Sequence, residues 1–253
     1  MTNGPCGIAV MAKASRPGRT KTRLVPPLTY EEAADLNPVF LRDAFANIAE
    51  AARNAPIRAF AAHGSPGEEN FFAGLGLEPR QLIPAAFPNF GDCLFAGIVG
   101  MFEAGCSSAC VLNADTPDLP TGYLVRIAAE LAGGRDRVVI GPADDGGYYI
   151  LGISRPHRRL FEDIDWSTER VLGQTVARAT QLGLELVTLP IWSDIDDAQS
   201  LARLARRLEA TAAPHMTQPH RAAHSAAHLL QALRSTDLRL RLMGASPLEV
   251  DAA

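Results

Sequence analysis

The sequence contains few cysteines for its length. Four in 253 residues, at positions 6, 93, 106 and 110, are too few and too irregularly spaced for a disulfide framework. Cys106 and Cys110 lie four residues apart, but no second pair of ligands follows at the distance seen in a zinc finger. We therefore expect reduced, mostly buried thiols and no structural zinc.

A long hydrophobic stretch is also missing. The sequence contains no run of about eighteen apolar residues, the length needed to span a membrane. The N-terminal text MTNGPCGIAVMAKASR lacks the basic start, long apolar stretch and cleavage site of a secretory signal. We expect a cytoplasmic protein with no membrane partner.

Positive charge is not in excess. Lys and Arg number 24 against 28 Asp and Glu, a formal net charge of −4, which argues against general binding to nucleic acid. The glycine-rich nucleotide loops are absent as well. A Walker A loop would need glycines where Ser15 and Thr20 stand, and no dinucleotide-binding fingerprint is present, which weighs against a nicotinamide dehydrogenase. Any site that binds an anion must therefore depend on a local concentration of positive charge.

What is present is the composition of a globular protein, with 47% hydrophobic and 21% charged residues. A chain of this length can form one large α/β domain. We expect a catalytic domain over residues 1–209. Residues 210–253, rich in Ala, His and Arg, are expected to form a linker and a helical C-terminal appendage.

Apolar runs of strand length alternate with segments of helical periodicity. Strands are expected at 6–12, 57–62, 81–85, 109–114, 137–141, 148–153 and 184–189, and helices at about 29–53, 91–104, 121–132, 168–182, 196–209 and 224–242. Thr29 and Glu32 form a capping box, and Pro38 predicts a break or kink in the helix that follows. The alternation predicts a mainly parallel sheet flanked by helices on both faces, with ligands bound beyond the carboxyl ends of the strands.

A basic loop follows the first strand. KASRPGRTKTR, residues 13–23, holds five basic residues and no acid. Backbone amides around Pro17 and Gly18, with Lys21 and Arg23 as charged donors, suit the oxygens of a di- or triphosphate. The alternative is a solvated basic loop.

Two acidic clusters follow later strands. In NADTPDLP, residues 113–120, Asp115 leaves a buried strand, and in WSDIDD, residues 192–197, Asp194 and Asp196 face one way if the chain is extended. Carboxylates of this kind can hold Mg²⁺ or Mn²⁺. The alternatives are a turn residue for Asp115 and helix-capping acids for the second cluster.

A third cluster, GPADDGGYYILG at residues 141–152, pairs acids with glycines before a strand. Gly146 and Gly147 permit backbone conformations, or a close approach of a ligand, that other residues resist. Alone, the DDGG segment is no more than a good turn.

In their order these motifs, with DIDWSTERVL at 163–172, resemble the DUF2064 group of GT-A-like transferases over roughly residues 6–205. Members of that group are usually labelled glycosyltransferases, including those named for arsenosugar biosynthesis. They are similar to 2-phospho-L-lactate guanylyltransferases. The resemblance implies a single GT-A-like domain with the nucleotide-diphospho-sugar transferase fold.

The resemblance also implies site residues. Phosphate contacts fall on Arg16, Gly18, Lys21 and Arg23, and metal ligands for Mg²⁺ or Mn²⁺ on Asp115, Asp194 and Asp196. The substrate pocket comprises Asp145, Gly146, Gly147, Tyr148, Trp166, Ser167 and Thr168. Asp115, Lys21 and Asp145 are the expected catalytic residues.

One departure concerns the acceptor. The leucine-glycine-acid-arginine stretch usual in the group reads NFGDCLFAG here, at residues 89–97, so a contact from that arginine is missing. The C-terminal appendage lies outside the resemblance. Its histidines, His215, His220, His224 and His228, do not form a convincing metal site, and a docking or dimerisation helix that could give a homodimer is the preferred interpretation.

The function expected is a metal-dependent glycosyltransferase with a nucleotide-sugar donor and a small-molecule acceptor. A nucleotidyltransferase that uses a nucleoside triphosphate and releases pyrophosphate is the alternative, because both reactions need the same metal and the same cationic loop. A non-catalytic nucleotide-binding protein of the same fold is the third hypothesis.

Overall fold

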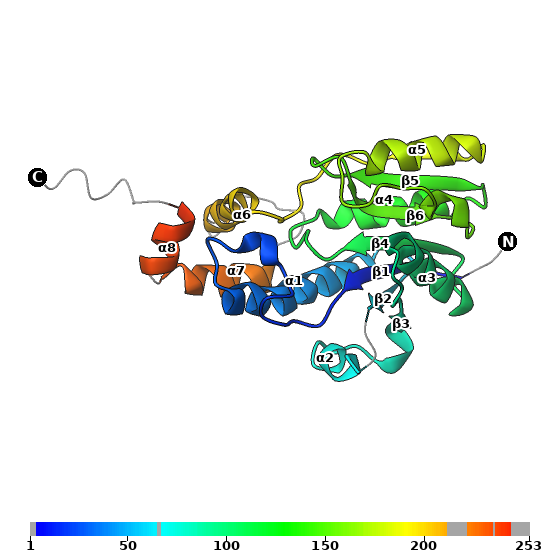
Figure 1. Cartoon of the computed structure of the whole chain (residues 1–253). Coiled ribbons are helices and arrows are strands. Elements are labelled where there is room, and N and C mark those ends of the chain that lie inside the picture. The colour runs from blue at the N-terminus through cyan, green and yellow to red at the C-terminus, as the bar shows by residue number, and fades with distance from the viewer. Residues whose placement is uncertain (1–3, 65–66, 212–221, 235, 244–253) are drawn as a thin grey trace, which may run out of the picture.

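A seven-stranded sheet forms the centre of the protein (Figure 1). The structure is a computed structural model that describes residues 4–64, 67–211, 222–234 and 236–243. The strand order is β3-β2-β1-β4-β6-β5-β7. The strands are β1 Cys6–Ala12, β2 Ile57–His63, β3 Leu82–Pro84, β4 Ser108–Asn113, β5 Arg137–Pro142, β6 Tyr148–Ile153 and β7 Glu185–Thr188.

The sheet is mainly parallel, as predicted. Strand β1 pairs in parallel with β2 and β4, β2 pairs so with β3, and β5 with β7. Strand β6 alone runs antiparallel to its neighbours β4 and β5. Only the turn at residues 143–147 separates β5 from β6, and so short a connection can join antiparallel strands but not parallel ones.

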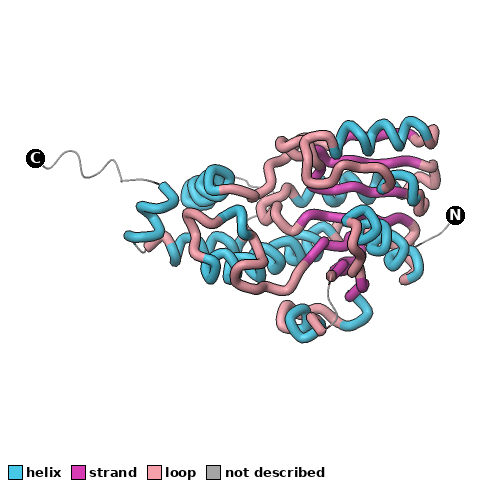
Figure 2. The backbone as a smooth tube through the Cα atoms, viewed as in Figure 1, coloured by secondary structure: helices cyan, strands magenta, loops and turns pink. Residues whose placement is uncertain are grey.

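Helices cover both faces of the sheet (Figure 2). The α-helices are α1 Tyr30–Ala51, α2 Glu69–Ala73, α3 Phe90–Glu103, α4 Thr121–Leu131, α5 Val171–Gln181, α6 Ala198–Thr211, α7 Ala223–Ala232 and α8 Thr236–Met243. Helices α1 and α4 share one apolar cluster with Ile8 and Val10, whereas α3 and α5 share another with Ala9. Because alternate residues of a strand face opposite sides, β1 is buried between the two layers. The predicted α/β class is confirmed.

Helix α1 begins at the predicted capping box. The Glu32 amide donates to Thr29 Oγ1 at 3.1 Å, and the Thr29 amide donates to Glu32 Oε2 at 2.8 Å. The predicted break at Pro38 does not occur, since α1 continues through Pro38 as one helix of 22 residues. Leu36 and Phe40 are buried on either side of the proline, and this packing offsets the hydrogen bond that proline cannot make.

The C-terminal segment forms α7 and α8 rather than one helical stretch over 224–242. With α6 they gather beside α1, at the end of the molecule away from the sheet (Figure 1). The predicted division into residues 1–209 and 210–253 stays a prediction, and its boundary falls within α6. His215 and His220 lie outside the described residues. No helix in the described ranges is long and apolar enough to cross a membrane.

Candidate active site

A cleft of about 540 Å³ opens beyond the carboxyl ends of β1 and β4, beside the turn between β5 and β6. Five segments that are far apart in the sequence form most of its lining. They contribute Lys13 and Arg19–Leu24, Asn113–Asp115, Asp145 with Gly147 and Tyr148, Trp166–Glu169, and Asp194–Asp196. The polar clusters expected to meet at this edge of the sheet therefore do meet.

The basic loop after β1 is held in shape by its own hydrogen bonds. The Arg19 and Thr20 amides donate to the Arg16 carbonyl at 3.0 and 3.1 Å, and Asn37 of α1 donates to the Lys13 carbonyl at 3.0 Å. Lys13, Arg19, Lys21 and Arg23 line the cleft. The loop thus presents four cations to one space, which is more than a solvated loop requires.

Two residues predicted to bind phosphate lie elsewhere. Arg16 and Gly18 are not among the residues that line the cleft. The Arg16 guanidinium lies 4.0 Å from the buried carboxylate of Glu68, while Gly18 adopts a left-handed conformation with φ 72°. Their role as phosphate contacts stays a prediction.

Lys21 is the most enclosed cation of the cleft. Its side chain is only 6% exposed, Nζ forms an ion pair with Asp115 Oδ1, and Nζ also lies 4.3 Å from the centre of the Phe40 ring. The Asp115 carbonyl accepts a hydrogen bond from the Ile195 amide at 2.9 Å. This bond ties the end of β4 to the segment that carries Asp194 and Asp196.

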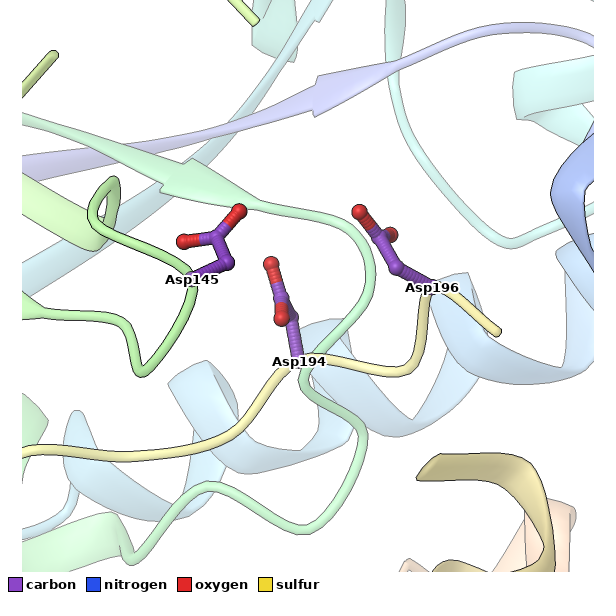
Figure 3. Close-up of side chains that lie close together, drawn as sticks. All are labelled: Asp145, Asp194 and Asp196. Carbon is purple, nitrogen blue, oxygen red and sulfur yellow. The ribbon is translucent and has the colours of Figure 1, made fainter. Parts of the chain in front are cut away.

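Three carboxylates point into a shared space (Figure 3). Asp145, Asp194 and Asp196 each offer an oxygen, and these oxygens all lie within 4.8 Å of one another. The predicted metal ligands were Asp115, Asp194 and Asp196. Asp145 joins the pair in the structure, and Asp115 is engaged by Lys21.

Burial and repulsion between like charges destabilise the ionised forms of these carboxyl groups. Burial is the main reason why the pKa of Asp194 is raised to about 7. The negative charges of Asp196, Asp145 and Asp115 add to that effect. Burial also raises the pKa of Asp196, and the positive charges of Arg23 and Lys21 oppose the shift. A divalent cation would relieve this repulsion, and oxygen atoms of carboxylates are the ligands that Mg²⁺ and Mn²⁺ prefer. The residues present therefore fit such an ion.

The chain beyond β7 explains where these acids lie. The Trp192 amide donates to the Pro142 carbonyl at 3.1 Å, so the extended chain runs on beside the end of β5. Asp197 then caps α6 by accepting from the Ser200 amide at 2.7 Å. The capping interpretation therefore applies to Asp197, whereas Asp194 and Asp196 face the cleft.

The DDGG segment is both a turn and a part of the site. Asp145 Oδ1 accepts from the Gly147 amide at 2.8 Å. Gly146 has φ 90°, and a Cβ there would lie 2.4 Å from the Glu169 carbonyl oxygen. Only glycine permits this approach, so Gly146 shapes the pocket without lining it.

The lining residues that come from α3, β6 and the segment up to the start of α5 include three aromatic residues, and we call this part of the lining the aromatic wall. The predicted pocket residues Tyr148, Trp166, Ser167 and Thr168 line it. The rings of Phe90 and Trp166 meet edge to face at 5.4 Å. Phe90 was not among the predicted site residues. The only signal for it in the sequence is an aromatic residue at the start of the helix expected after the segment NFGDCLFAG begins. Other lining residues outside the predicted set include Asn37, Leu94, Asn113, Glu169 and Val171.

Comparison with known proteins bears on the family and the fold. Residues 47–168 match the family "Uncharacterized protein conserved in bacteria (DUF2064)", which confirms the resemblance that the motifs predicted. No curated protein matches the chain.

Solved structures share the fold. A "putative nucleotide-diphospho-sugar transferase" from Desulfovibrio desulfuricans G20 is 23% identical, with a TM-score of 0.78, over 94% of this chain and 98% of that one. A CMP:2-keto-3-deoxy-manno-octonic acid synthetase in complex with CTP is 11% identical, with a TM-score of 0.54, over 83% and 100%. A cytidylyltransferase from Leptospira borgpetersenii serovar Hardjo-bovis (strain JB197) is 10% identical, with a TM-score of 0.51, over 96% and 99%. The chain has the GT-A-like fold of the nucleotide-diphospho-sugar transferases.

Proposed function

We propose that this chain, which resembles the DUF2064 family over residues 47–168, is a metal-dependent glycosyltransferase with a nucleotide-sugar donor and a small-molecule acceptor. One observation carries the proposal: four cations of a single loop and three clustered carboxylates line the same cleft. A diphosphate bound between them would contact the cations directly and the carboxylates through a divalent ion. Such a cleft stabilises negative charge that develops on a leaving phosphate.

The metal belongs, in this proposal, to Asp145, Asp194 and Asp196, whose oxygens lie close enough to share one ion. Bound there, Mg²⁺ or Mn²⁺ would polarise the phosphate oxygens and neutralise charge on the departing diphosphate. Asp115 was predicted as a ligand, and we now assign it to holding Lys21. It becomes free to bind metal only if Lys21 leaves it.

Lys21 and Arg23 act on the phosphates. An ammonium group has three donor protons, so Lys21 can keep Asp115 and still donate to a phosphate oxygen. Arg23 Nη1 lies 3.3 Å from Asp196 Oδ2, and the planar guanidinium leaves further N–H groups for phosphate. Arg16 and Gly18 support the loop that carries both residues.

The acceptor would occupy the other side of the cleft. Gly147, Tyr148, Trp166, Ser167 and Thr168 line it there, next to Asp145 of the carboxylate cluster, with Gly146 fixing the turn. The acceptor hydroxyl would attack the anomeric carbon of the donor, the bond from that carbon to the nucleoside diphosphate would break, and the hydroxyl proton would pass to the departing phosphate oxygen. Correct positioning supplies much of the rate in such a reaction, because no protein nucleophile is needed.

A thermal-shift screen tests the proposal. Mg²⁺ or Mn²⁺ is combined in turn with nucleotide-sugars and with nucleoside triphosphates, since a ligand that binds only the native state raises the melting temperature. We expect the largest rise with a nucleotide-sugar. A larger rise with a triphosphate would favour nucleotidyl transfer instead, and no rise with any compound would favour the non-catalytic alternative.

A further inference from the structure

Charge is segregated within the cleft. Every lysine or arginine among the described residues that line it belongs to the loop of residues 13–23, and no histidine lines it. The aromatic wall presents Phe90 and Trp166, includes the buried residues Leu94, Tyr148 and Val171, and carries one exposed acid, Glu169. The two sides are therefore built for different chemical groups.

We propose that this aromatic wall is the acceptor subsite and that it selects an uncharged hydroxyl compound with an apolar face over a phosphorylated or carboxylated one. The inference rests on the proposed function in naming the bound compound as the acceptor, whereas the selectivity of the wall depends only on the residues of the wall.

The geometry of the wall supports an apolar face. Phe90 is 45% exposed although its ring packs edge to face against Trp166. A Cβ on Gly91 would lie 2.3 Å from the Phe161 carbonyl oxygen and 3.1 Å from the Trp166 ring. Glycine at this position thus lets the first turn of α3 lie directly against Trp166. Rings arranged in this way present broad apolar surfaces to a ligand, and pockets of this kind use few polar groups to orient it. The hydroxyl groups of Ser167 and Thr168 line the same wall.

Arginines near the wall are already paired. Arg158 Nη2 lies 2.5 Å from Asp92 Oδ1 of α3, and Arg170 Nη1 lies 3.1 Å from Asp165 Oδ2. Neither arginine lines the cleft.

An anionic acceptor would therefore lose water at this wall without gaining a cation. It would also approach the carboxylate of Glu169. Taking a charge out of water without a partner is strongly unfavourable, whereas a neutral hydroxyl compound avoids that penalty.

The test measures binding without nucleotide but with excess inorganic pyrophosphate, which occupies the cations of the phosphate loop, so that the wall is examined separately from them. Aryl and alkyl glucosides are compared with the same compounds carrying a 6-phosphate or a 6-carboxylate, by ligand-detected NMR and calorimetry. We expect the neutral compounds to bind at least about tenfold more tightly, a difference of about 1.4 kcal/mol.

Three variants locate the binding. Phe90→Ala should lower the affinity for the neutral compounds about tenfold or more. Phe87→Ala is the matched control, because Phe87 is 51% exposed and does not line the cleft, and its affinity should equal that of the wild type. Glu169→Lys should bring the phosphorylated compounds to the affinity of the neutral ones or beyond. Thermal melts establish that each variant is folded.

Each of three results would overturn the inference. The wild type could bind the anionic compounds as tightly as the neutral ones or more tightly, it could bind no neutral compound, or Phe90→Ala could leave the affinity unchanged. The proposed function fails separately. If metal-dependent nucleotide binding is seen while the neutral compounds do not bind, only this inference is wrong. If the neutral compounds bind and no nucleotide does, the selectivity stands and the transferase proposal is wrong.

Discussion

At the scale of single residues, Asp194 is a carboxylic acid whose pKa its surroundings shift strongly. Its pKa is raised from 3.8 to about 7, mainly by burial. The native state therefore binds more protons than the unfolded state between these two values, and its stability falls as pH rises through that window and is constant above it. A buried carboxyl group with so strongly raised a pKa is typical of a functional site.

The variant Asp194→Asn removes this charge. Without metal, we expect its melting temperature at pH 8 to rise by roughly 2–4 °C, equivalent to about 1 kcal/mol for a protein of this size. The stabilisation of the wild type by Mn²⁺ should be lost. Differential scanning fluorimetry with and without MnCl₂ measures both effects, and an undiminished Mn²⁺ response would contradict the metal assignment.

Asp197 offers a matched control three residues away. It caps α6 through Ser200 and is exposed. Asp197→Ala should lower the stability by about 1 kcal/mol, because a helix cap is lost, and should keep the full response to Mn²⁺. The two substitutions thus move the melting temperature in opposite directions.

Lys21 carries the second prediction at this scale. Lys21→Met keeps the aliphatic stem against Phe40 and removes the charge. Hydrogen bonds to charged groups contribute about 1.5–3 kcal/mol, so we expect the affinity for nucleoside diphosphates with Mn²⁺ to fall about 10- to 100-fold by calorimetry. Arg16→Ala, in the same loop but outside the cleft, should change it much less. An equal loss in Arg16→Ala would instead restore the predicted phosphate contact of Arg16.

How far residues could be predicted depends on how local their geometry is. The two-residue spacing of Asp194 and Asp196 predicts a common direction wherever the backbone is extended, and both line the cleft. The approach of Asp145 could not be predicted in this way. It depends on the bridge between Ala143 and Trp192, which joins segments about fifty residues apart, and sequence spacing contains no signal for such a contact.

At the scale of elements, the segment around η1 Thr22–Leu24 is braced by α8. Arg241 of α8 donates to the Pro27 carbonyl and lies 2.8 Å from Glu32 Oε1. Leu24 shares an apolar cluster with Leu229 of α7. The C-terminal helices therefore support the segment that carries Lys21 and Arg23.

Arg241→Gln tests this support. We expect a loss of about 1 kcal/mol of stability, seen as a melting temperature lower by roughly 2–4 °C, together with a nucleotide affinity reduced severalfold. Arg53→Gln is the control, because Arg53 follows the end of α1 and pairs with Glu50 of that helix in an exposed ion pair, and such pairs contribute little. If Arg241→Gln matches Arg53→Gln in both measurements, α8 does not support the loop.

Elements with strong periodicity were predicted well, and one of the errors falls at the site. The helix expected from residue 168 begins at Val171, because Trp166–Glu169 line the cleft and Ser167 adopts a left-handed conformation with φ 63°. Helical propensity alone does not reveal such a loop. Places where a pattern fails in this way are expected at functional sites.

At the scale of the whole molecule, the C-terminal appendage packs on its own chain. Asp43 of α1 is fully buried, and its carboxylate accepts from the amides of His224 and Ser225 at 2.9 and 2.7 Å. A side chain of α1 therefore caps the start of α7. Dimerisation through the appendage, predicted from the sequence, stays a prediction.

Asp43→Ala should leave these two amides without a partner. A buried unsatisfied group costs about 1–3 kcal/mol, so we expect a lower melting temperature and earlier proteolytic cleavage near α7. The rise in melting temperature with Mn²⁺ should remain. Unchanged stability and unchanged cleavage would show that α7 is not held in this way.

The central claim is that the basic loop and the carboxylate cluster together hold a diphosphate through a divalent ion. Calorimetric titration of nucleoside diphosphates into the wild-type protein, with MnCl₂ and then with a chelator, tests it most directly. We predict that at least one diphosphate binds with the metal and that this binding is lost with the chelator. Equal binding under both conditions, or no binding with the metal, would contradict the claim.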